Sequence, residues 1–338
     1  MRLAVVLFNL GGPDDQDAVQ PFLFNLFNDP AIIGLPNPFR WMLAKFISKT
    51  RTPSAQENYK LMGGGSPLVP ETVKQVDALE AQLNSAGIEA KCFIAMRYWK
   101  PFTEEAVKSV EAYAPDKIIL LPLYPQYSTT TTASSVKEWY RAGGGLATTI
   151  CCYPTLDGVV RSHVSNIVDT WKNAGSPGNI RVLLSAHGLP EKVVKGGDPY
   201  QWQVEQTSAA IKEKLPSDWE VEVCYQSRVG PLKWIGPSTD ESIIKAGQQG
   251  MNVIVSPVAF VSEHIETLVE LDIEYGELAK HNGVKTYLRA PALGVAKEFI
   301  SGLADLTRRA ALDHREIFSE NGVRICPHSW KKCPMSEG

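Results

Sequence analysis

The chain lacks the features that mark several specialised classes of protein. Six cysteines in 338 residues are too few and too scattered for the disulfide framework of a small secreted protein, so a reducing compartment is expected. The first apolar stretch, residues 3–8, is too short to span a membrane and is not followed by a signal-peptide cleavage site. A net charge of −3, without any basic and aromatic-rich stretch, gives no attraction to nucleic acid. These absences predict a cytoplasmic protein that does not bind nucleic acid.

Familiar catalytic motifs are missing as well. There is no Gly-x-Ser-x-Gly nucleophile elbow, and neither His-Glu-x-x-His nor Cys-x-x-Cys is present to form a closed zinc site. The glycines at 63–65 lack both the following lysine and the spacing of a phosphate-binding loop or a dinucleotide fingerprint. Close approach of the backbone to a flat or bulky molecule is an equally good interpretation of these glycines.

The composition is that of a globular protein of about two domains, with 44% hydrophobic and 21% charged residues. Short apolar runs alternate with helical patterns, which indicates parallel strand–helix units. The expected strands are residues 3–8, 91–95, 117–123, 147–153, 180–185, 221–225, 252–257 and 285–289. We therefore predict an α/β fold with two similar Rossmann-like domains, each with a four-stranded parallel sheet flanked by helices, and a cleft between them.

The expected domains follow from this pattern and its punctuation. A Gly-Gly-Pro turn at 11–13 ends the first strand of one half, and a His-Gly-Leu-Pro turn at 187–190 ends that of the other. The predicted ranges are 1–155 for the N-terminal domain with an insertion at 20–65, 156–292 for the C-terminal domain, and 293–338 for a final helix, reaching to about 318, with a cysteine-containing tail that packs back on the body.

The insertion is unusually apolar and carries several cations. Its basic residues are Arg40, Lys45, Lys49 and Arg51. Its apolar residues are Phe22, Leu23, Phe24, Leu26, Phe27, Ile32, Ile33, Leu35, Phe39, Trp41, Met42, Phe46 and Ile47. Two interpretations stay open. The segment forms two amphipathic core helices, or it forms an apolar lip over a cleft, whose cations meet acidic lipid or the carboxylates of a substrate.

The segment at 262–274 is acidic in a regular way. Read as an α-helix at about 100° per residue, it stacks Glu266, Glu270 and Glu274 one turn apart. Like charges at this spacing repel each other. The column therefore indicates a solvated face, a cation site or a path for protons.

Three further acids and the preceding strand bear on this choice. Glu263 and Glu277 fall on the same side of the predicted helix, whereas Asp272 falls on the apolar arc, where a carboxylate needs a partner. The apolar run at 253–261 reads as a buried parallel strand, so the acids begin at the carboxyl end of a strand. Open α/β sheets bind their ligands at that edge.

His187 is the second candidate for chemistry. It follows a predicted strand in the same half of the chain as Glu266, so both side chains should open onto one crevice. An imidazole beside a carboxylate is a suitable proton acceptor near neutral pH. The residues alone therefore point to proton abstraction combined with loose, acidic handling of a metal.

Seven short segments, in a fixed order between residue 3 and about residue 300, match those of one enzyme family. They are Leu10–Pro13, Gly63–Pro67, Arg97–Tyr98, Tyr124–Ser128, Ser185–Pro190, Trp234–Pro237 and Glu263–Leu268. On these segments the chain resembles the ferrochelatases of the bacterial, class I chelatase type, which insert ferrous iron into a porphyrin. The resemblance implies two Rossmann-like domains around a porphyrin cleft, with the insertion as a lip over that cleft.

The resemblance also implies roles for individual residues. His187 and Glu266 correspond to the catalytic pair, with His187 as proton acceptor and Glu266 as its electrostatic partner or second acceptor. The expected metal-handling set is His187, Glu266, Glu270 and Glu274, the last two as a conduit for protons or hydrated iron. The expected porphyrin-binding set is Leu10, Tyr59, Ser66, Arg97, Tyr98, Tyr124, Ser128, Trp234 and Phe260. Within it, Arg97 and Ser128 are the candidates for contact with propionates.

The cysteines depart from part of that family. Some ferrochelatases hold a two-iron two-sulfur cluster with one internal cysteine and three cysteines in the tail. Here the tail offers Cys326 and Cys333, and Cys151 and Cys152 are the candidates for further thiolates. Thr129 stands where animal members have the internal cysteine. Free buried thiols are the favoured interpretation, and no cofactor is required.

Three functions stay open. The first is insertion of ferrous iron into protoporphyrin IX to form protohaem, with distortion of the macrocycle and removal of two pyrrole protons. The second is chelation with another tetrapyrrole or metal, such as coproporphyrin III with iron, and the third is non-catalytic binding of haem or iron. We expect the first, because an apolar lip suits the vinyl edge of protoporphyrin. The expected partners are protoporphyrin IX, ferrous iron and, through the lip, the inner face of the cytoplasmic membrane; the sequence does not choose between monomer and homodimer.

Overall fold

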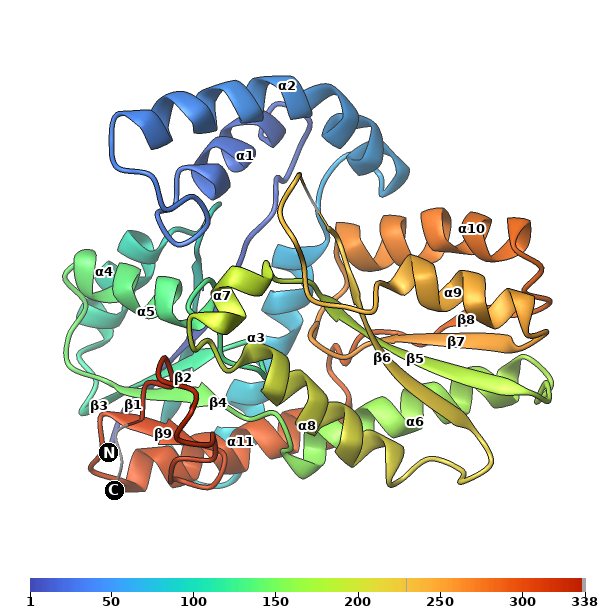
Figure 1. Cartoon of the computed structure of the whole chain (residues 1–338). Coiled ribbons are helices and arrows are strands. Elements are labelled where there is room, and N and C mark those ends of the chain that lie inside the picture. The colour runs from blue at the N-terminus through green and yellow to red at the C-terminus, as the bar shows by residue number, and fades with distance from the viewer. Residues whose placement is uncertain (229, 336–338) are drawn as a thin grey trace. The chain divides into compact units, whose positions relative to one another are not determined.

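The computed structural model describes residues 1–228 and 230–335, and the chain divides into two compact units. Unit 1 comprises residues 1–123, 128–151 and 304–318, and unit 2 comprises residues 124–127, 152–303 and 319 onward. Each unit is built on a parallel sheet flanked by helices (Figure 1). The predicted fold class is therefore confirmed.

The sheet of unit 1 is organised around one buried strand. β1 (Leu3–Asn9) is apolar up to its last residue, as expected of a strand covered on both faces. It pairs in parallel with β2 (Ala90–Met96) and β3 (Lys117–Pro122), and β3 pairs in parallel with β4 (Thr148–Cys152). A fifth strand, β9 (Ile317–Ser319), completes the order β2-β1-β3-β4-β9. The prediction of four strands here is wrong, because β9 lies in a segment predicted as the end of the final helix.

The terminal helix is shorter than predicted. α11 spans Lys297–Leu312, and does not run from residue 293 to about 318. Just after it, the Asp313 carboxylate accepts a hydrogen bond from the backbone N–H of Arg315 at 2.8 Å. This local bond competes with helical hydrogen bonding and favours a turn. The chain then enters β9, so the expected end of the helix is a strand.

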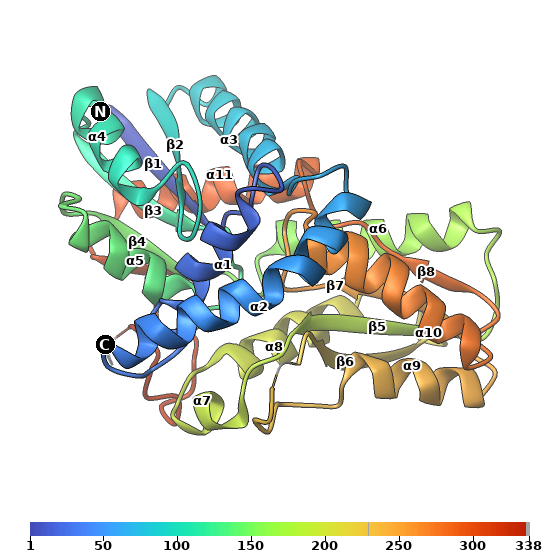
Figure 2. The same ribbon diagram turned by 90° about the horizontal axis from the view of Figure 1, so that it is seen from above.

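Helices cover the sheet of unit 1 and form its insertion. The covering helices are α3 (Leu68–Ser85), α4 (Thr103–Tyr113) and α5 (Thr132–Arg141). The insertion consists of α1 (Val19–Phe27) and α2 (Phe39–Leu61), which lie side by side (Figure 2). The expected pair of helices is therefore present.

Most apolar side chains of α2 and of the loop before it point to solvent. The exposed ones are Ile32, Leu35, Phe39, Trp41, Met42, Leu43, Phe46 and Leu61, with Phe46 66% exposed. Of α2, Ala44, Ser48 and Tyr59 are the buried residues. The interpretation of the insertion as two closed core helices is thus wrong for α2. No helix within residues 1–228 and 230–335 is long and apolar enough to cross a membrane.

The sheet of unit 2 has four parallel strands in the order β6-β5-β7-β8. They are β5 (Ile180–His187), β6 (Glu220–Gln226), β7 (Asn252–Pro257) and β8 (Tyr287–Arg289). The chain leaves β5 toward β6 on one side and later returns to β7 on the other. The carboxyl end of β5 is therefore a topological switch point, where open α/β sheets bind ligands.

Helices cover both faces of this sheet (Figure 1). One face carries α6 (Asp157–Asn173) and α8 (Tyr200–Lys212), and the other carries α9 (Thr239–Gln248) and α10 (Tyr275–His281). Apolar β5 side chains alternate between the two cores, as the two-residue period of a strand requires.

The acidic segment forms a π-helix, η1 (Glu266–Glu274), directly before α10. The prediction of an α-helix beginning near residue 262 is wrong in its start and its winding. A π-helix makes i→i+5 hydrogen bonds and takes about 4.4 residues per turn, and such helices are rare and frequent at functional sites. Glutamates four residues apart still share one side, because they then lie about 30° short of a full turn instead of about 40° beyond it.

Candidate active site

The end of β5 delivers His187 to the carboxyl edge of the unit 2 sheet. Val182 and Leu184 pack into the core under α6 and α8, whereas Leu183 packs into the core under α9, α10 and η1. His187 belongs to the same alternate set as Leu183, so its ring faces the side of η1. The Tyr200 hydroxyl donates to the His187 carbonyl at 3.0 Å, while the His187 side chain stays 37% exposed. The backbone is held and the ring remains accessible.

His187 pairs with the first glutamate of η1. Its Nδ1 lies 3.0 Å from Oε2 of Glu266. Burial lowers the pKa of His187, but the Glu266 charge and hydrogen bond outweigh burial and, with Glu270, raise that pKa above its ordinary value. Burial alone would raise the pKa of Glu266. The His187 charge outweighs burial and holds the pKa of Glu266 well below its usual range. The pair thus stabilises an imidazolium, and His187 Nε2 is the nitrogen left to accept a proton.

Glu270, one turn further along η1, is held by four donors. Its Oε1 accepts from the Ser227 backbone N–H at 2.8 Å and the Tyr275 hydroxyl at 3.1 Å. Its Oε2 accepts from Gln226 Nε2 at 3.0 Å and from the Ser227 hydroxyl. Burial and the Glu266 charge nevertheless raise the pKa of Glu270. Gln226 also donates to the Glu266 carbonyl at 3.3 Å, which ties both glutamates to the end of β6.

The predicted acidic column is shorter than the sequence suggested. Glu274 is exposed at the end of η1, and Glu277 is exposed on α10. Glu263 precedes the helix and pairs with Arg289 at 2.7 Å. Asp272 does not lie on an apolar arc: it is exposed and pairs with the same Arg289. The winding of the π-helix turns Asp272 away from the apolar side that an α-helix would have given it.

His264 is a second histidine in contact with the pair. Its Nε2 lies 3.8 Å from Glu266 Oε2, and its ring packs on Phe260 with 4.5 Å between the ring centroids. Burial lowers the pKa of His264 despite the nearby Glu266 and Glu263 charges. Its Nδ1 is buried without a hydrogen-bond partner among the described residues. The imidazole of His264, next to Glu266, is therefore neutral.

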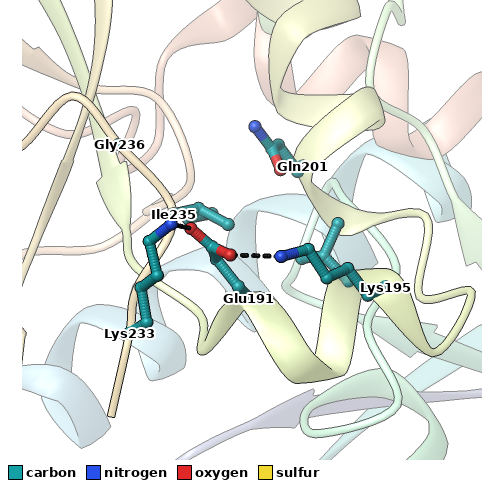
Figure 3. A pocket seen from close by; sticks show the side chains of 7 residues that line it. Glu191, Lys195, Gln201, Lys233, Ile235 and Gly236 are labelled. Carbon is teal, nitrogen blue, oxygen red and sulfur yellow. Dashed lines mark hydrogen bonds and ion pairs between the residues drawn. The ribbon is translucent and has the colours of Figure 1, made fainter. Parts of the chain in front are cut away.

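Trp234 lies next to the residue that follows His187. A Cβ added to Gly188 would meet the Trp234 ring at 3.2 Å and the Gln226 carbonyl oxygen at 3.0 Å, so glycine permits this close packing. Beside it, α7 (Glu191–Lys195) forms a pocket of about 440 Å³ with Gln201, Lys233, Ile235 and Gly236. There, Glu191 binds both Lys195 and Lys233 (Figure 3).

The remaining predicted site residues of unit 2 are Tyr124, which is buried, and Phe260, which is half-buried. In unit 1, Leu10 and Ser66 are half-buried, and Tyr59, Tyr98 and Ser128 are buried. Gly65 serves close backbone packing: a Cβ there would meet the Asp14 carbonyl oxygen at 2.3 Å, and Ser66 N–H donates to the Pro13 carbonyl at 2.7 Å. Gly63 and Gly64 instead have φ values of +92° and +106°, which favour glycine.

Arg97 belongs to a buried polar network in unit 1. Its Nη2 lies 2.9 Å from Asp29 Oδ2, and its Nε donates to the Ser134 hydroxyl at 2.8 Å. The Tyr98 hydroxyl also donates to Asp29 Oδ2, at 2.9 Å. Asp29 lies between α1 and α2. Arg97 therefore anchors the insertion to the sheet, a role that the sequence did not indicate.

Comparisons with known proteins identify relatives of this chain. The family model described as ferrochelatase matches residues 2–311. A ferrochelatase of Caulobacter vibrioides is 59% identical over 341 residues, covering 100% of this chain and 98% of the relative. One of Hyphomonas neptunium is 55% identical, covering 99% and 95%, and one of Rickettsia bellii is 48% identical, covering 98% and 94%. The chain belongs to the ferrochelatase family.

Solved structures extend the similarity to the chelatase fold. This ferrochelatase-family chain superposes with a TM-score of 0.52 on SirB from Bacillus subtilis with Fe3+, at 15% identity, covering 92% of this chain and 96% of that one. For CbiX, the terminal enzyme of sirohaem biosynthesis in denitrifying bacteria, the TM-score is 0.52 at 14% identity, with 93% and 100% covered. Identities this low establish the fold alone.

In the part of the chain that the structure describes, no group of three or more His, Cys, Asp or Glu side chains is arranged to hold a metal ion. Cys151 and Cys152 are buried residues of β4. A hydrogen bond from Cys326 lowers the pKa of Cys333 to about 6 in the tail. This donor set does not fit a four-thiolate cluster, so no chemistry is assigned to one.

Sequence reasoning missed the residues that orient the pair and its neighbours. Gln226, Ser227 and Tyr275 hold Glu270, and Tyr200 holds the His187 backbone. Gln226 and Ser227 carried one available signal, since Gln226 ends the strand β6 beside β5 and Ser227 follows it. His264 was visible in the matched segment Glu263–Leu268, but its identity alone did not distinguish it from a structural histidine.

Proposed function

We propose that this protein inserts ferrous iron into protoporphyrin IX to form protohaem, with His187 and Glu266 as its catalytic pair. The observation that carries this proposal is the 3.0 Å contact between them, at the switch point of the unit 2 sheet in a member of the ferrochelatase family. The exposure of the His187 side chain makes it the residue able to meet a substrate.

A free-base porphyrin carries two inner N–H protons that must leave before the metal is bound. His187 Nε2 accepts one pyrrole proton, and Glu266 stabilises the resulting imidazolium through Nδ1. The raised pKa of His187 makes the ring a stronger acceptor than free imidazole. His187 must lose the proton on Nε2 before it accepts the second pyrrole proton, and Glu270, whose own pKa is raised, is the nearby carboxylate proposed to take up a proton from the site.

Ferrous iron is the second substrate. Glu274 is the solvent-exposed carboxylate at the far end of η1, so we assign it the first contact with the hydrated cation. Glu266 and Glu270 follow on the same side of the helix toward His187. Trp234 and Phe260 in unit 2 are the apolar side chains proposed to hold and bend the macrocycle.

The exposed apolar face of α2 favours protoporphyrin over coproporphyrin III. Phe39 and Phe46 are exposed on one face of α2, and Trp41, which packs edge-on against Phe24, is also exposed, with Lys45 4.9 Å from its ring. This pattern suits the apolar and cationic requirements of attachment to an anionic membrane surface. A substrate handed over at such a surface should itself be apolar. Protoporphyrin IX meets this requirement better than coproporphyrin III, which has two additional propionates.

Anaerobic assays with purified protein test the proposal. Ferrous iron is added with protoporphyrin IX or coproporphyrin III, and metal insertion is followed by absorbance. We expect a kcat/KM for protoporphyrin at least tenfold higher. A preference for coproporphyrin overturns the substrate, and stoichiometric binding of porphyrin without insertion overturns the enzymatic role.

A further inference from the structure

Two side chains of the short strand β8 form hydrogen bonds with the π-helix η1. The Nε and Nη2 atoms of Arg289 donate to the two carboxylate oxygens of Asp272 at 2.7 and 2.8 Å, and its Nη1 donates to Glu263 Oε1 at 2.7 Å. Tyr287, two residues earlier and hence on the same face of the strand, donates its hydroxyl to the Leu271 carbonyl at 2.6 Å. One strand therefore binds both the segment before η1 and the helix itself.

The Arg289 contacts have the geometry of a strong charge-assisted clamp. A guanidinium that meets a carboxylate with two parallel N–H···O bonds is specific in direction as well as strong, and lysine cannot reproduce it. Arg289 is 13% exposed and Glu263 22% exposed, so water screens this pair only partly. Glu263 also accepts the backbone N–H of Ala292 at 2.9 Å, which fixes the position of the clamp.

The position of Asp272 depends on how the helix is wound. Asp272 follows Glu266 by six residues, which is about 240° past a full turn in an α-helix but about 130° past a full turn in a π-helix. Conversion to an α-helix would therefore swing Asp272 by about 110° relative to Glu266 and take it off Arg289. The pair of contacts made by Arg289 is compatible with the π form.

The same conversion would disturb the candidate site. Glu270 would rotate by about 70° relative to Glu266, away from the donors on Gln226 and Ser227. Glu266 would then keep its contact with His187 only at the expense of those bonds. The winding of η1 and the arrangement of the site are thus linked through Arg289.

We propose that Arg289 is a positioning residue, which joins Glu263 to Asp272 and so maintains the π-helical winding that places Glu266 and Glu270 for the reaction. The inference rests on the proposed function, because its kinetic readout is iron insertion. The side-chain contacts of Arg289 are with Asp272 and Glu263, and neither residue belongs to the catalytic pair, so Arg289 acts through the helix.

The test compares Asp272→Asn, Arg289→Met and the double variant with wild type. Small misplacements of catalytic groups cost up to about 10²-fold in rate, so we expect each single variant to lower kcat for iron insertion about tenfold or more. If the two residues act as one clamp, Asp272→Asn changes kcat less than about twofold in the Arg289→Met background. Arg315→Lys is the matched control, because Arg315 makes a similar two-point pair with Asp313 in unit 1.

Hydrogen exchange measured by mass spectrometry provides a readout independent of activity. Peptides covering residues 264–276 should exchange faster in Asp272→Asn and Arg289→Met than in wild type and Arg315→Lys, with the rest of unit 2 unchanged. Should Arg289→Met fail to fold, the partly exposed Asp272→Asn still decides the matter. Wild-type exchange in that variant with more than half of kcat retained would overturn the clamp. A wild-type protein that inserts no iron would overturn the proposed function, and faster exchange confined to 264–276 would still support the clamp.

Discussion

The central strands of the two sheets, β1 and β5, end in residues that differ in exposure: one is buried and the other is accessible. Asn9 ends β1 and is 5% exposed; its Nδ2 donates to the Thr72 hydroxyl at 3.2 Å and its Oδ1 accepts from the next backbone N–H at 2.9 Å. His187 ends β5, is 37% exposed and pairs with Glu266. Both strands have parallel neighbours on both sides. The sheets therefore do not cause the difference.

The covering helix makes the difference. In unit 1 the α-helix α3 brings a hydroxyl to the strand end and closes it, whereas in unit 2 the π-helix η1 brings two carboxylates and leaves the ring open. A topological switch point supplies a position for chemistry, and the residues that face it decide whether chemistry occurs there.

Replacing the two strand-end residues should separate their roles most strongly. His187→Ala removes the proposed proton acceptor, and general-base catalysis contributes about 10²–10⁴-fold, so we expect kcat to fall by at least about 10²-fold with an unchanged melting temperature. Asn9→Ala should do the reverse: it leaves a buried N–H without its partner, costs about 1–3 kcal/mol of stability, and keeps kcat per folded molecule within about twofold. A His187→Ala protein retaining more than about a third of wild-type kcat contradicts the assigned base.

Glu266→Gln should have the next largest effect and should move the pH profile. The neutral imidazole accepts the proton, so activity rises as pH increases through the pKa of His187. Removing the Glu266 charge leaves burial, which lowers that pKa, as the dominant influence. The acid limb of kcat/KM should therefore shift to lower pH while the plateau falls by at least about tenfold. An acid limb that stays in place shows that His187 is not the titrating group.

The sequence predicted the eight main strands and the candidate pair because those features depend on local patterns. Parallel strands between two helical layers appear in the sequence as continuous apolar runs. The ends of the predicted strands lie within two residues of the ends of the observed ones. His187 and Glu266 follow two strands of the same sheet, so the topology alone brings them to one edge.

The winding of η1 could not be predicted, since glutamates four residues apart share a side in both α- and π-helices. The contacts compatible with the π form come from Tyr287 and Arg289, which lie beyond η1 in the chain and show no pattern that marks them. Arg97 is a similar case: its buried partner Asp29 is 68 positions away, in a loop without periodicity. Side-chain pairing across the fold decides such features.

Glu270→Gln and Glu274→Gln should differ from each other by a smaller margin. Glu270 is buried among four donors, and an amide would place an N–H₂ group against some of them, so we expect a fall in kcat of about tenfold. Glu274 is exposed, and its change should chiefly raise the KM for ferrous iron, by about two- to fivefold in low salt. Identical kinetics in both variants and in Glu266→Gln would return the column to a solvated structural face.

Substitutions in α2 should have the smallest effect on turnover in detergent. They should have the largest effect on binding to membranes. This helix and α3 belong to the same unit, yet α3 buries its apolar stripe, whereas α2 exposes Phe39, Trp41 and Phe46. Apolar side chains beside Lys45 and Lys49 should bind anionic vesicles weakly, with each cation adding about 1 kcal/mol near the surface. Changing the three aromatic residues to Ser should abolish co-sedimentation with such vesicles at low salt, with less than a twofold change in kcat in detergent. Leu146→Ser with Leu312→Ser, which removes exposed apolar side chains elsewhere in unit 1, is the matched control and should leave sedimentation unchanged. If wild type does not sediment with vesicles even at low salt, the exposed face of α2 is not a membrane contact, and the main reason for preferring protoporphyrin over coproporphyrin is lost.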